Sequence, residues 1–449
     1  MFRRLSALLL ILPALAIPGV ASASPSCFGT SAPLTVEEQR LTATLPAGGP
    51  AVGPELVRLA GFDGFVTDVK RQLCEVRTPQ RAQRLARNAG DDLWRTAVDR
   101  AQGRLVRGTL DRFDDRPLYW ARLQLSAALR QWTPSFPVPA DARTALLKTF
   151  DRGARGLDDV QFPIGKTVRR VLVSGFDPFQ LDGSGVRISN PAGASALQLD
   201  GRVLQTASGP AVVQAVSFPV VWGYFDEGIV EEAYGSALRD RARRPDVIMT
   251  ISQGRPGRFD VERWAGAWRG GFPDNNRESV TGAVPPAAGW PQPDAQFIET
   301  TLPYQQMLAA PAGAYPVNFN QAFCVWADSS RPGTGATTCR SDAPAPGEIA
   351  ASGGGGNYLS NESMYRSNRV RVGLGLTGVA GGHLHTPVLG EPADPAALTD
   401  ADFEARRQAI AAQALTLAAA AAAVPAPASP VPAPPAIRAD ILAVPGTVL

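Results

Sequence analysis

The stretch "VRRVLVSGF" (residues 168–176) decides the fold of the larger part of this 449-residue chain. It is predicted to be a short apolar strand that ends in a turn. Further candidates follow it: strands at 211–221 ("AVVQAVSFPVV") and 245–252 ("PDVIMTIS"), one or two strands within 369–388, and an amphipathic helix at 223–242. Strands that alternate with helices predict a three-layer α/β/α domain with a mostly parallel sheet, over residues 168–424. In such sheets, binding groups gather at strand ends.

The chain ahead of this strand has a different character. Residues 24–160 are predicted to form a mostly helical domain, because 79–106 and 117–132 combine helical spacing of apolar residues with strong helix formers. The proline-bearing segment 133–141 separates them from a further short helix. This part contains no recognisable catalytic motif, which favours an accessory domain.

The α/β part also contains two stretches that look inserted. One lies near 277–296 and is rich in Pro and Ala, and the other lies near 321–349 and carries two cysteines. A helix is predicted over 399–423, with Thr399 as its N-cap. The Pro/Ala-rich residues 425–449 are predicted to form an extended tail.

The N-terminus has the features of a secretory signal peptide over residues 1–23. Arg3 and Arg4 precede an apolar run at 7–17 that is too short to span a bilayer, and Ala-Ser-Ala at 21–23 fits a cleavage site. The alternative is an N-terminal anchor that is kept. We predict a secreted or periplasmic protein without stable membrane insertion.

The charge balance gives no reason to expect a nucleic-acid partner. Removal of residues 1–23 takes away two arginines and no acids, so 44 − 2 = 42 basic side chains face 41 acidic ones. No motif suggests a cofactor, and the sequence does not indicate an oligomeric state.

Four cysteines in a chain with a signal peptide suggest disulfides. They are Cys27, Cys74, Cys324 and Cys339, and three pairings are possible. Proximity along the chain favours Cys27–Cys74 and Cys324–Cys339.

The two histidines of the chain, His383 and His385, stand two apart and would lie on the same face of a strand. A histidine is the usual general base for a serine nucleophile. A structural role is equally compatible with such a pair. A zinc site is a weak alternative, because no HExxH or CxxC spacing occurs. Glu262 could orient a histidine, or it could form a surface ion pair.

A family resemblance favours a catalytic role for these residues. The motifs that carry it occur in one order along the chain: "VLVSGFDPF" (171–179), "SNPAG" (189–193), "SFPVVWG" (217–223), "RPDVIMTISQG" (244–254), "DVERWAG" (260–266), "FPDNN" (272–276), "TTLPYQQM" (300–307) and "GGHLHTPVL" (381–389). Together they resemble pyroglutamyl peptidase I, the cysteine peptidases that remove an N-terminal pyroglutamate. The resemblance implies that Glu262 is the third catalytic residue and that His385, not His383, is the base.

The nucleophile is the main departure from this family. "GGNYLSNESMY" (355–365) resembles the segment that carries the family's catalytic cysteine, and it places Ser360 at that position. The gap from Ser360 to His385 is 385 − 360 = 25 residues, close to the family's spacing. Cys324 is the competing nucleophile. Its gap to His385 is 61 residues, and Cys339 is near enough to pair with it.

The resemblance also implies a pocket for the pyrrolidone ring. Its expected residues are Phe176 and Phe179 as the two sides of a sandwich, Gln253 as a polar wall, Asn190 as a brace and Phe272 as an apolar wall. A further departure concerns an arginine that the family has just before its P-D-N motif, where this chain has Gly271, with Arg269 nearby.

These observations predict an exported hydrolase that removes N-terminal pyroglutamate, or a related cap, from peptides through Ser360, His385 and Glu262. The alternative is a binding protein that keeps the ring pocket but has lost catalysis together with the thiol. A cysteine enzyme that uses Cys324 is a third reading, which a Cys324–Cys339 bridge would exclude.

Overall fold

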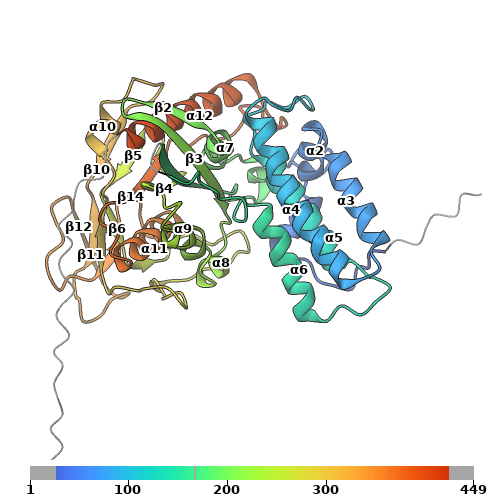
Figure 1. Cartoon of the computed structure of the whole chain (residues 1–449), viewed down its shortest axis with the longest axis horizontal. Coiled ribbons are helices and arrows are strands. Elements are labelled where there is room, and N and C mark those ends of the chain that lie inside the picture. Colours follow the sequence, from blue (N-terminus) through green and yellow to red (C-terminus); the bar gives the residue numbers. More distant parts are fainter. Residues whose placement is uncertain (1–26, 166–167, 424–449) are drawn as a thin grey trace, which may run out of the picture.

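The computed structural model describes residues 27–165 and 168–423, so the predicted signal peptide (1–23) and the whole of the predicted tail (425–449) lie outside the described residues. The first part of the chain is helical (Figure 1). Its elements are α1 (Val36–Gln39), η1 (Arg40–Thr42), α2 (Val52–Leu59), α3 (Asp63–Glu75), α4 (Pro79–Ala101), α5 (Arg116–Gln131) and α6 (Ala140–Gly153).

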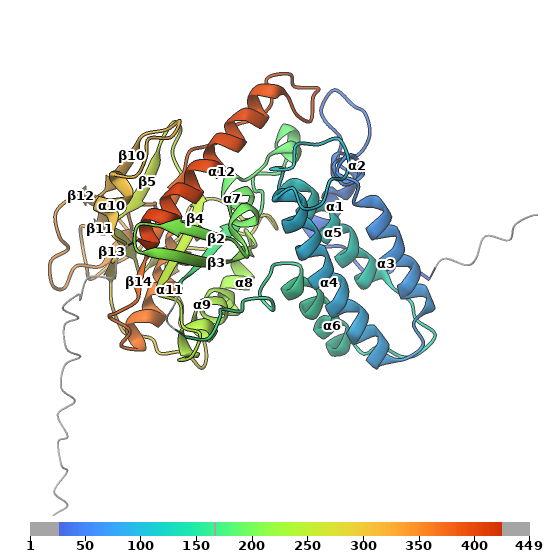
Figure 2. The same ribbon diagram turned by 45° about the horizontal axis from the view of Figure 1, so that its top comes forward.

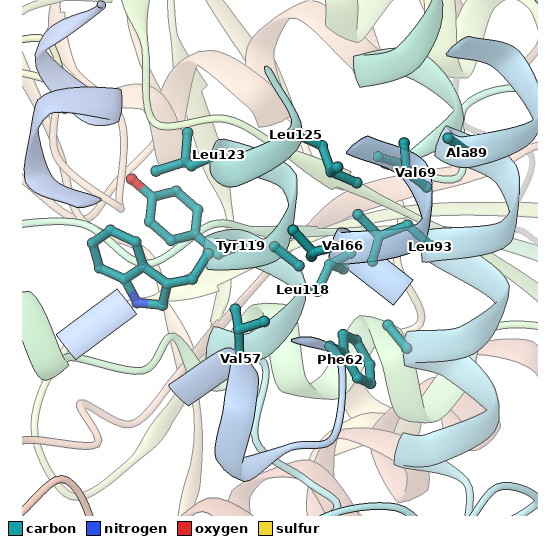
Figure 3. Close-up of a cluster of buried hydrophobic side chains, with 14 of the residues drawn as sticks. Val57, Phe62, Val66, Val69, Ala89, Leu93, Leu118, Tyr119, Leu123 and Leu125 are labelled. Atoms are coloured by element: carbon teal, nitrogen blue, oxygen red, sulfur yellow. The ribbon is translucent and has the colours of Figure 1, made fainter. Parts of the chain in front are cut away.

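The helical part has a hydrophobic core of its own. Phe62, Val66, Leu93 and Leu125 meet between α2, α3, α4 and α5 (Figure 3). Helix α4 begins where Thr78 accepts a hydrogen bond from the backbone of Arg81 and Pro79 occupies the first turn. Local capping and an apolar helix face therefore account for this bundle.

The second part combines a seven-stranded sheet with helices, a three-stranded sheet and two strand pairs. Its elements are β1 (Arg169–Phe176), η2 (Gly183–Arg187), α7 (Pro191–Leu199), β2 (Val203–Thr206), β3 (Gly209–Phe218), α8 (Trp222–Asp226), α9 (Ile229–Arg239), β4 (Val247–Gln253), β5 (Phe259–Glu262), β6 (Trp264–Gly266), β7 (Trp268–Arg269), β8 (Gly282–Ala283), β9 (Phe297–Glu299), α10 (Tyr304–Leu308), β10 (Val317–Asn320), β11 (Phe323–Trp326), β12 (Thr337–Arg340), β13 (Ala350–Ser352), α11 (Leu359–Gly373), β14 (Ala380–Thr386) and α12 (Ala401–Ala422).

The predicted α/β architecture is confirmed. The large sheet has the order β10-β5-β14-β4-β1-β3-β2. Four of its six strand pairings are parallel, and only β14–β5 and β2–β3 are antiparallel. Helices α7 and α12 cover one face and α9 and α11 the other, which makes three layers (Figure 2). The central strands are buried on both faces, as their continuous apolar sequences require.

Residues 369–388, where one or two strands are predicted, hold the single strand β14 after the end of helix α11. Two other local predictions need correction. The helix expected at 223–242 is divided into α8 and α9 at Gly228, whose φ of 83° only glycine adopts readily. The N-cap of α12 is Asp400 instead of Thr399, because the Asp400 carboxylate accepts from the backbone of Phe403.

The two parts of the chain share buried apolar surface. Leu181, Val186 and Leu197 belong to the α/β part by sequence, yet they are buried in the core cluster of the helical part. Helix α4 lies against α7, and helix α2 lies against η2, on the side of the α/β part where α7 is labelled (Figures 1 and 2). The first part of the chain is therefore packed directly against the turn that follows β1.

Both favoured cysteine pairings are present. Cys27 is bonded to Cys74, and Cys324 is bonded to Cys339 across the antiparallel strands β11 and β12. The bridged Cys324 has no free thiol, so the reading of Cys324 as a nucleophile is wrong. In the described ranges, no helix combines the length and the apolar character that crossing a membrane requires.

Candidate active site

The candidate site lies where parallel strands end. Phe176 is the last residue of β1, Gln253 is the last residue of β4, and His385 is the penultimate residue of β14. These strands are neighbours in register, with Thr386 beside Gln253. Their carboxyl ends therefore meet at one edge of the sheet, where ligands bind in open α/β folds.

Glu262 and His385 form a buried pair at this edge. His385 Nδ1 lies 2.8 Å from Glu262 Oε1, and the two residues are 4% and 1% exposed. An ionised carboxylate only accepts hydrogen bonds, so we assign the proton to Nδ1. This assignment leaves Nε2 as the basic nitrogen, and no described residue forms a hydrogen bond with it. The pair has the arrangement that a general base requires.

Asn320 holds the other oxygen of this carboxylate. It ends β10 and lies directly beside Glu262 on the adjacent parallel strand. Its Nδ2 donates to Glu262 Oε2 at 2.7 Å and to the carbonyl of Gly354 at 2.9 Å. The sequence analysis missed Asn320, because only the pairing of β10 with β5 reveals its role.

His383 has a different environment from His385, although their rings are 4.4 Å apart. Its Nδ1 is 2.6 Å from Thr250 Oγ1 and its Nε2 is 2.8 Å from Ser252 Oγ. Burial, and secondarily the neighbouring His385, hold the pKa of His383 well below its usual 6.5. With both nitrogens engaged, His383 is a structural residue.

Ser360 is the second residue of helix α11, and Tyr358 is the N-cap, so Ser360 does not cap the helix. Ser360 lines a cavity of about 430 Å³ that Glu262 and His385 also line. Its Oγ donates to the carbonyl of Gly355 at 3.5 Å, and within the described part of the chain it makes no hydrogen bond to His385. The three residues thus share one cavity without a completed hydrogen-bond chain.

The glycine turn before Ser360 is required by close contacts. A Cβ at Gly354 would lie 2.1 Å from Glu262 Oε2, and a Cβ at Gly355 would lie 2.3 Å from His385 Cε1. No side chain fits at either distance. The backbone of the turn therefore packs directly against Glu262 and His385, with no side chain between them.

A second, smaller cavity of about 40 Å³ opens beside Ser360. Four of the expected pocket residues line it: Phe176, Phe179, Asn190 and Gln253. Tyr358 also lines this cavity, and the sequence analysis missed it. Three of the nine residues that line this small cavity are aromatic.

The pocket residues have distinct partners. Phe176 also packs in the core, with ring centroids 5.9 Å from Phe218 and 6.2 Å from Phe225. Gln253 Oε1 accepts from the backbone of Leu389, and its Nε2 has no hydrogen-bond partner among the described residues. Asn190 caps α7 and donates to the carbonyl of Asp177. Gln253 therefore presents a free donor, and Asn190 acts as a brace.

One expected pocket residue, Phe272, lies elsewhere. Phe272 is 63% exposed and lies at the rim of the larger cavity, against Tyr358, and it does not line the small cavity. Arg269 pairs with Asp226 and with the buried Glu362, so it is turned away from both cavities. Arg255, which the sequence analysis did not consider, lies in the larger cavity instead. In the described ranges, no group of three His, Cys, Asp or Glu could hold a metal ion.

These features define a three-layer α/β protein in which a serine, a histidine and a glutamate share a cavity at the carboxyl edge of the sheet. Two family models match the chain: the PA0049 N-terminal domain over residues 20–151 and the PA0049 C-terminal domain over residues 170–291 and 327–390. The uncharacterized protein PA0049 of Pseudomonas aeruginosa is 34% identical over 486 aligned residues, which cover 85% of this chain and 88% of that protein. The chain belongs to the PA0049 family.

The chain is also similar to two crystal structures of pyroglutamyl peptidase I from Bacillus amyloliquefaciens. They are 20% and 19% identical, cover 57% and 56% of this chain, and are themselves covered to 96% and 97%, with TM-scores of 0.36 and 0.35. At these scores the similarity carries no functional weight.

Proposed function

We propose that this protein is a hydrolase that removes N-terminal pyroglutamate, or a related N-terminal cap, from peptides. Ser360 is the nucleophile, His385 the general base, and Glu262 the group that orients His385. The observation that carries the proposal is the 2.8 Å contact of His385 Nδ1 with Glu262, which leaves Nε2 without a partner in a cavity that Ser360 shares.

The reaction proceeds through an acyl-enzyme. His385 Nε2 takes the proton of Ser360 as Oγ attacks the cap's own carbonyl carbon, in the amide bond that joins the cap to the peptide. The protonated His385 then gives this proton to the departing amine, and the C–N bond breaks. Water, deprotonated by His385, attacks the ester and releases the cap with Ser360 restored.

The start of helix α11 is suited to the oxyanion of this reaction. The backbone N–H groups of Leu359 and Ser360 belong to its first turn and have no hydrogen-bond partner among the described residues. Free N–H groups at a helix N-terminus attract negative charge, and such donors stabilise a tetrahedral intermediate.

The small cavity supports a cap as the recognised group. Phe176 and Phe179 give it apolar walls, and the free Nε2 of Gln253 can donate to a lactam carbonyl. A cavity of about 40 Å³ admits a compact neutral ring better than a continuing peptide chain. The peptide beyond the cap would then lie in the larger cavity.

The two disulfides are consistent with export to an oxidising compartment. A serine nucleophile suits such a compartment better than a cysteine. In an oxidising compartment an exposed thiol of low pKa is oxidised or captured in a disulfide. A serine avoids both outcomes.

One observation favours a second candidate, a protein that binds capped peptides without cleaving them. The hydroxyl of Ser360 donates to the carbonyl of Gly355 and not to His385. Catalysis requires this hydroxyl to rotate toward Nε2, whereas binding alone does not.

The test is to incubate the mature protein with a fluorogenic pyroglutamyl amide, beside Ser360→Ala. The control is Ser367→Ala, because Ser367 lies two turns further along α11 and bonds only to its own helix. We expect fluorophore release by the wild type and by Ser367→Ala, and none by Ser360→Ala. No release by the wild type, with pyroglutamate still bound in calorimetry, would establish the binding protein instead.

A further inference from the structure

We infer that the helical part of the chain positions the small cavity: through Asp177 it holds the turn that carries Phe176 and Phe179. The name of the ligand rests on the proposed function, but the positioning role does not. Asp177 follows Phe176 directly and is 3% exposed. Its side chain points away from the cavity lining and toward the helices.

Two arginines of the helical part bind this carboxylate. Arg122 of α5 places Nη2 2.5 Å from Asp177 Oδ2, and Arg155, two residues beyond α6, places Nη1 2.8 Å from the same oxygen. All three side chains are almost completely buried. A buried carboxylate with two guanidinium partners has one well-defined position, because leaving it would expose uncompensated charges.

The charges in this cluster are balanced. Asp151, at the end of α6, accepts from Arg155 at 2.8 Å and lies 3.6 Å from Arg122. Burial alone would raise the pKa of Asp177, but Arg122 and Arg155 outweigh it and hold this pKa below its usual value. Asp177 therefore stays ionised, and the two arginines keep their partner.

The helical part also holds the backbone of the turn indirectly, through two asparagines that bond to both. Asn190 donates to the carbonyl of Asp177 at 2.8 Å, and Asp115, next to helix α5, accepts from the backbone N–H of Asn190 at 3.0 Å. Asn275 donates to the carbonyl of Pro178 at 2.9 Å and to the carboxylate of Glu37 at 3.0 Å.

These contacts concentrate on the one turn that forms the aromatic walls of the cavity. A contact elsewhere on the same boundary shows the difference. Gln102 donates to the carbonyls of Leu197 and Asp200, at the far end of α7, and within the described part of the chain it forms no hydrogen bond with the turn. Gln102 joins the two parts of the chain without positioning the cavity.

The experiment uses the full mature chain with Ser360→Ala as background, so that binding is measured without turnover. Pyroglutamate is titrated by calorimetry into this protein and into Asp177→Asn, Arg122→Met and Gln102→Met versions of it. We expect Asp177→Asn and Arg122→Met to raise Kd about tenfold, because each removes a charge-assisted hydrogen bond that fixes the pocket wall. Gln102→Met should leave Kd within about twofold, and Arg122→Lys, which keeps the charge, should restore part of the loss.

Hydrogen exchange gives a readout that needs no ligand. Amides of residues 176–190 should exchange faster in Asp177→Asn and Arg122→Met, while those of β14 and β5 keep the wild-type rate. If the unmutated pocket does not bind pyroglutamate, the proposed function fails, and exchange alone decides the positioning role. Unchanged exchange in both variants, or equal acceleration by Gln102→Met, would overturn the inference.

Discussion

The functional residues on the two sides of Ser360 are held in place by different kinds of contact. On one side, Glu262 and His385 are fixed by direct hydrogen bonds between neighbouring strands, with Asn320 on the next strand. On the other side, Phe176 and Phe179 sit on a turn whose charge partners, Arg122 and Arg155, come from the helical part. The base is thus held within the α/β part of the chain, whereas the pocket wall depends on both parts.

This difference separates the two functions of the site. Changes at the sheet should lower the rate of the chemical step and leave binding of the cap nearly intact. Changes at the helical boundary should do the reverse. The first three predictions below test this separation on the sheet side, the fourth concerns stability, and they run from the largest expected effect on activity to the smallest.

Glu262→Gln should have the largest effect. The amide can donate to His385 Nδ1, which favours the tautomer that has its proton on Nε2 and cannot accept from Ser360. We expect kcat to fall by about 10³- to 10⁴-fold. Steady-state kinetics with the pyroglutamyl amide measures this fall. A Kd for pyroglutamate that rises as steeply as kcat falls would contradict the separation of the two sides.

Gly355→Ala should have the next largest effect. The added Cβ would stand 2.3 Å from His385 Cε1, so the imidazole must move away from Ser360. A displacement of about 1 Å costs about 100-fold in rate. Gly378→Ala is the control, because a Cβ there meets nothing within 4 Å. Equal kcat values for the two variants would show that the ring position is not critical.

Asn320→Ala should have a smaller effect. Glu262 Oε2 loses its donor while Oε1 keeps His385, so the carboxylate is less well oriented. We expect kcat to fall about tenfold with Kd unchanged, which is the size of loss seen when a residue that orients a functional side chain is removed. Asn318 is an exposed asparagine on the same strand, and Asn318→Ala should retain the wild-type kcat. A loss shared by both variants would point to the strand and not to the hydrogen bond.

The smallest effect on activity at neutral pH is expected from Asp115→Asn, which instead changes how stability depends on pH. Burial, and then the nearby Asp114, raise the pKa of Asp115 from 3.8 to about 6. Between these values the folded state binds a proton that the unfolded state has lost, so this group stabilises the protein as pH falls from 6 to 4. The unfolding free energy of the wild type relative to Asp115→Asn should rise by about 2 kcal/mol between pH 7 and pH 4.5.

Urea unfolding at the two pH values measures this difference, and His383→Gln serves as a contrast. The pKa of His383 is lowered in the folded state, so below pH 6.5 the unfolded state binds a proton that the folded state does not bind. His383 therefore costs stability as pH falls through 6.5, and His383→Gln should lose this part of the decline. If both substitutions changed the pH dependence of the unfolding free energy in the same direction, the environments assigned to Asp115 and His383 would be contradicted.

Much of the sheet could be predicted, and the reason is local. The strands β1, β4 and β14 are apolar runs bounded by turn residues, and short-range patterns suffice to find them. The contact between Glu262 and His385 was expected only through a family resemblance, because 123 residues separate them.

What could not be predicted depends on pairings between distant elements. Asn320 acquires its role only when β10 lies beside β5, and no local pattern marks it. Arg122 is one of many arginines in the helical part, and its partner Asp177 is 55 residues away. The exposure of Phe272 follows from the path of a loop, which an apolar residue type does not indicate.

The shared apolar core has a consequence for how the two parts of the chain fold. Leu181, Val186 and Leu197 complete the core of the helical part, although the chain reaches them only after β1. The helices therefore cannot bury their apolar faces fully until the pocket turn and α7 lie against them. Completion of the first core and docking of the α/β part are thus one cooperative event, and the helical part alone is expected to be less stable than the whole chain.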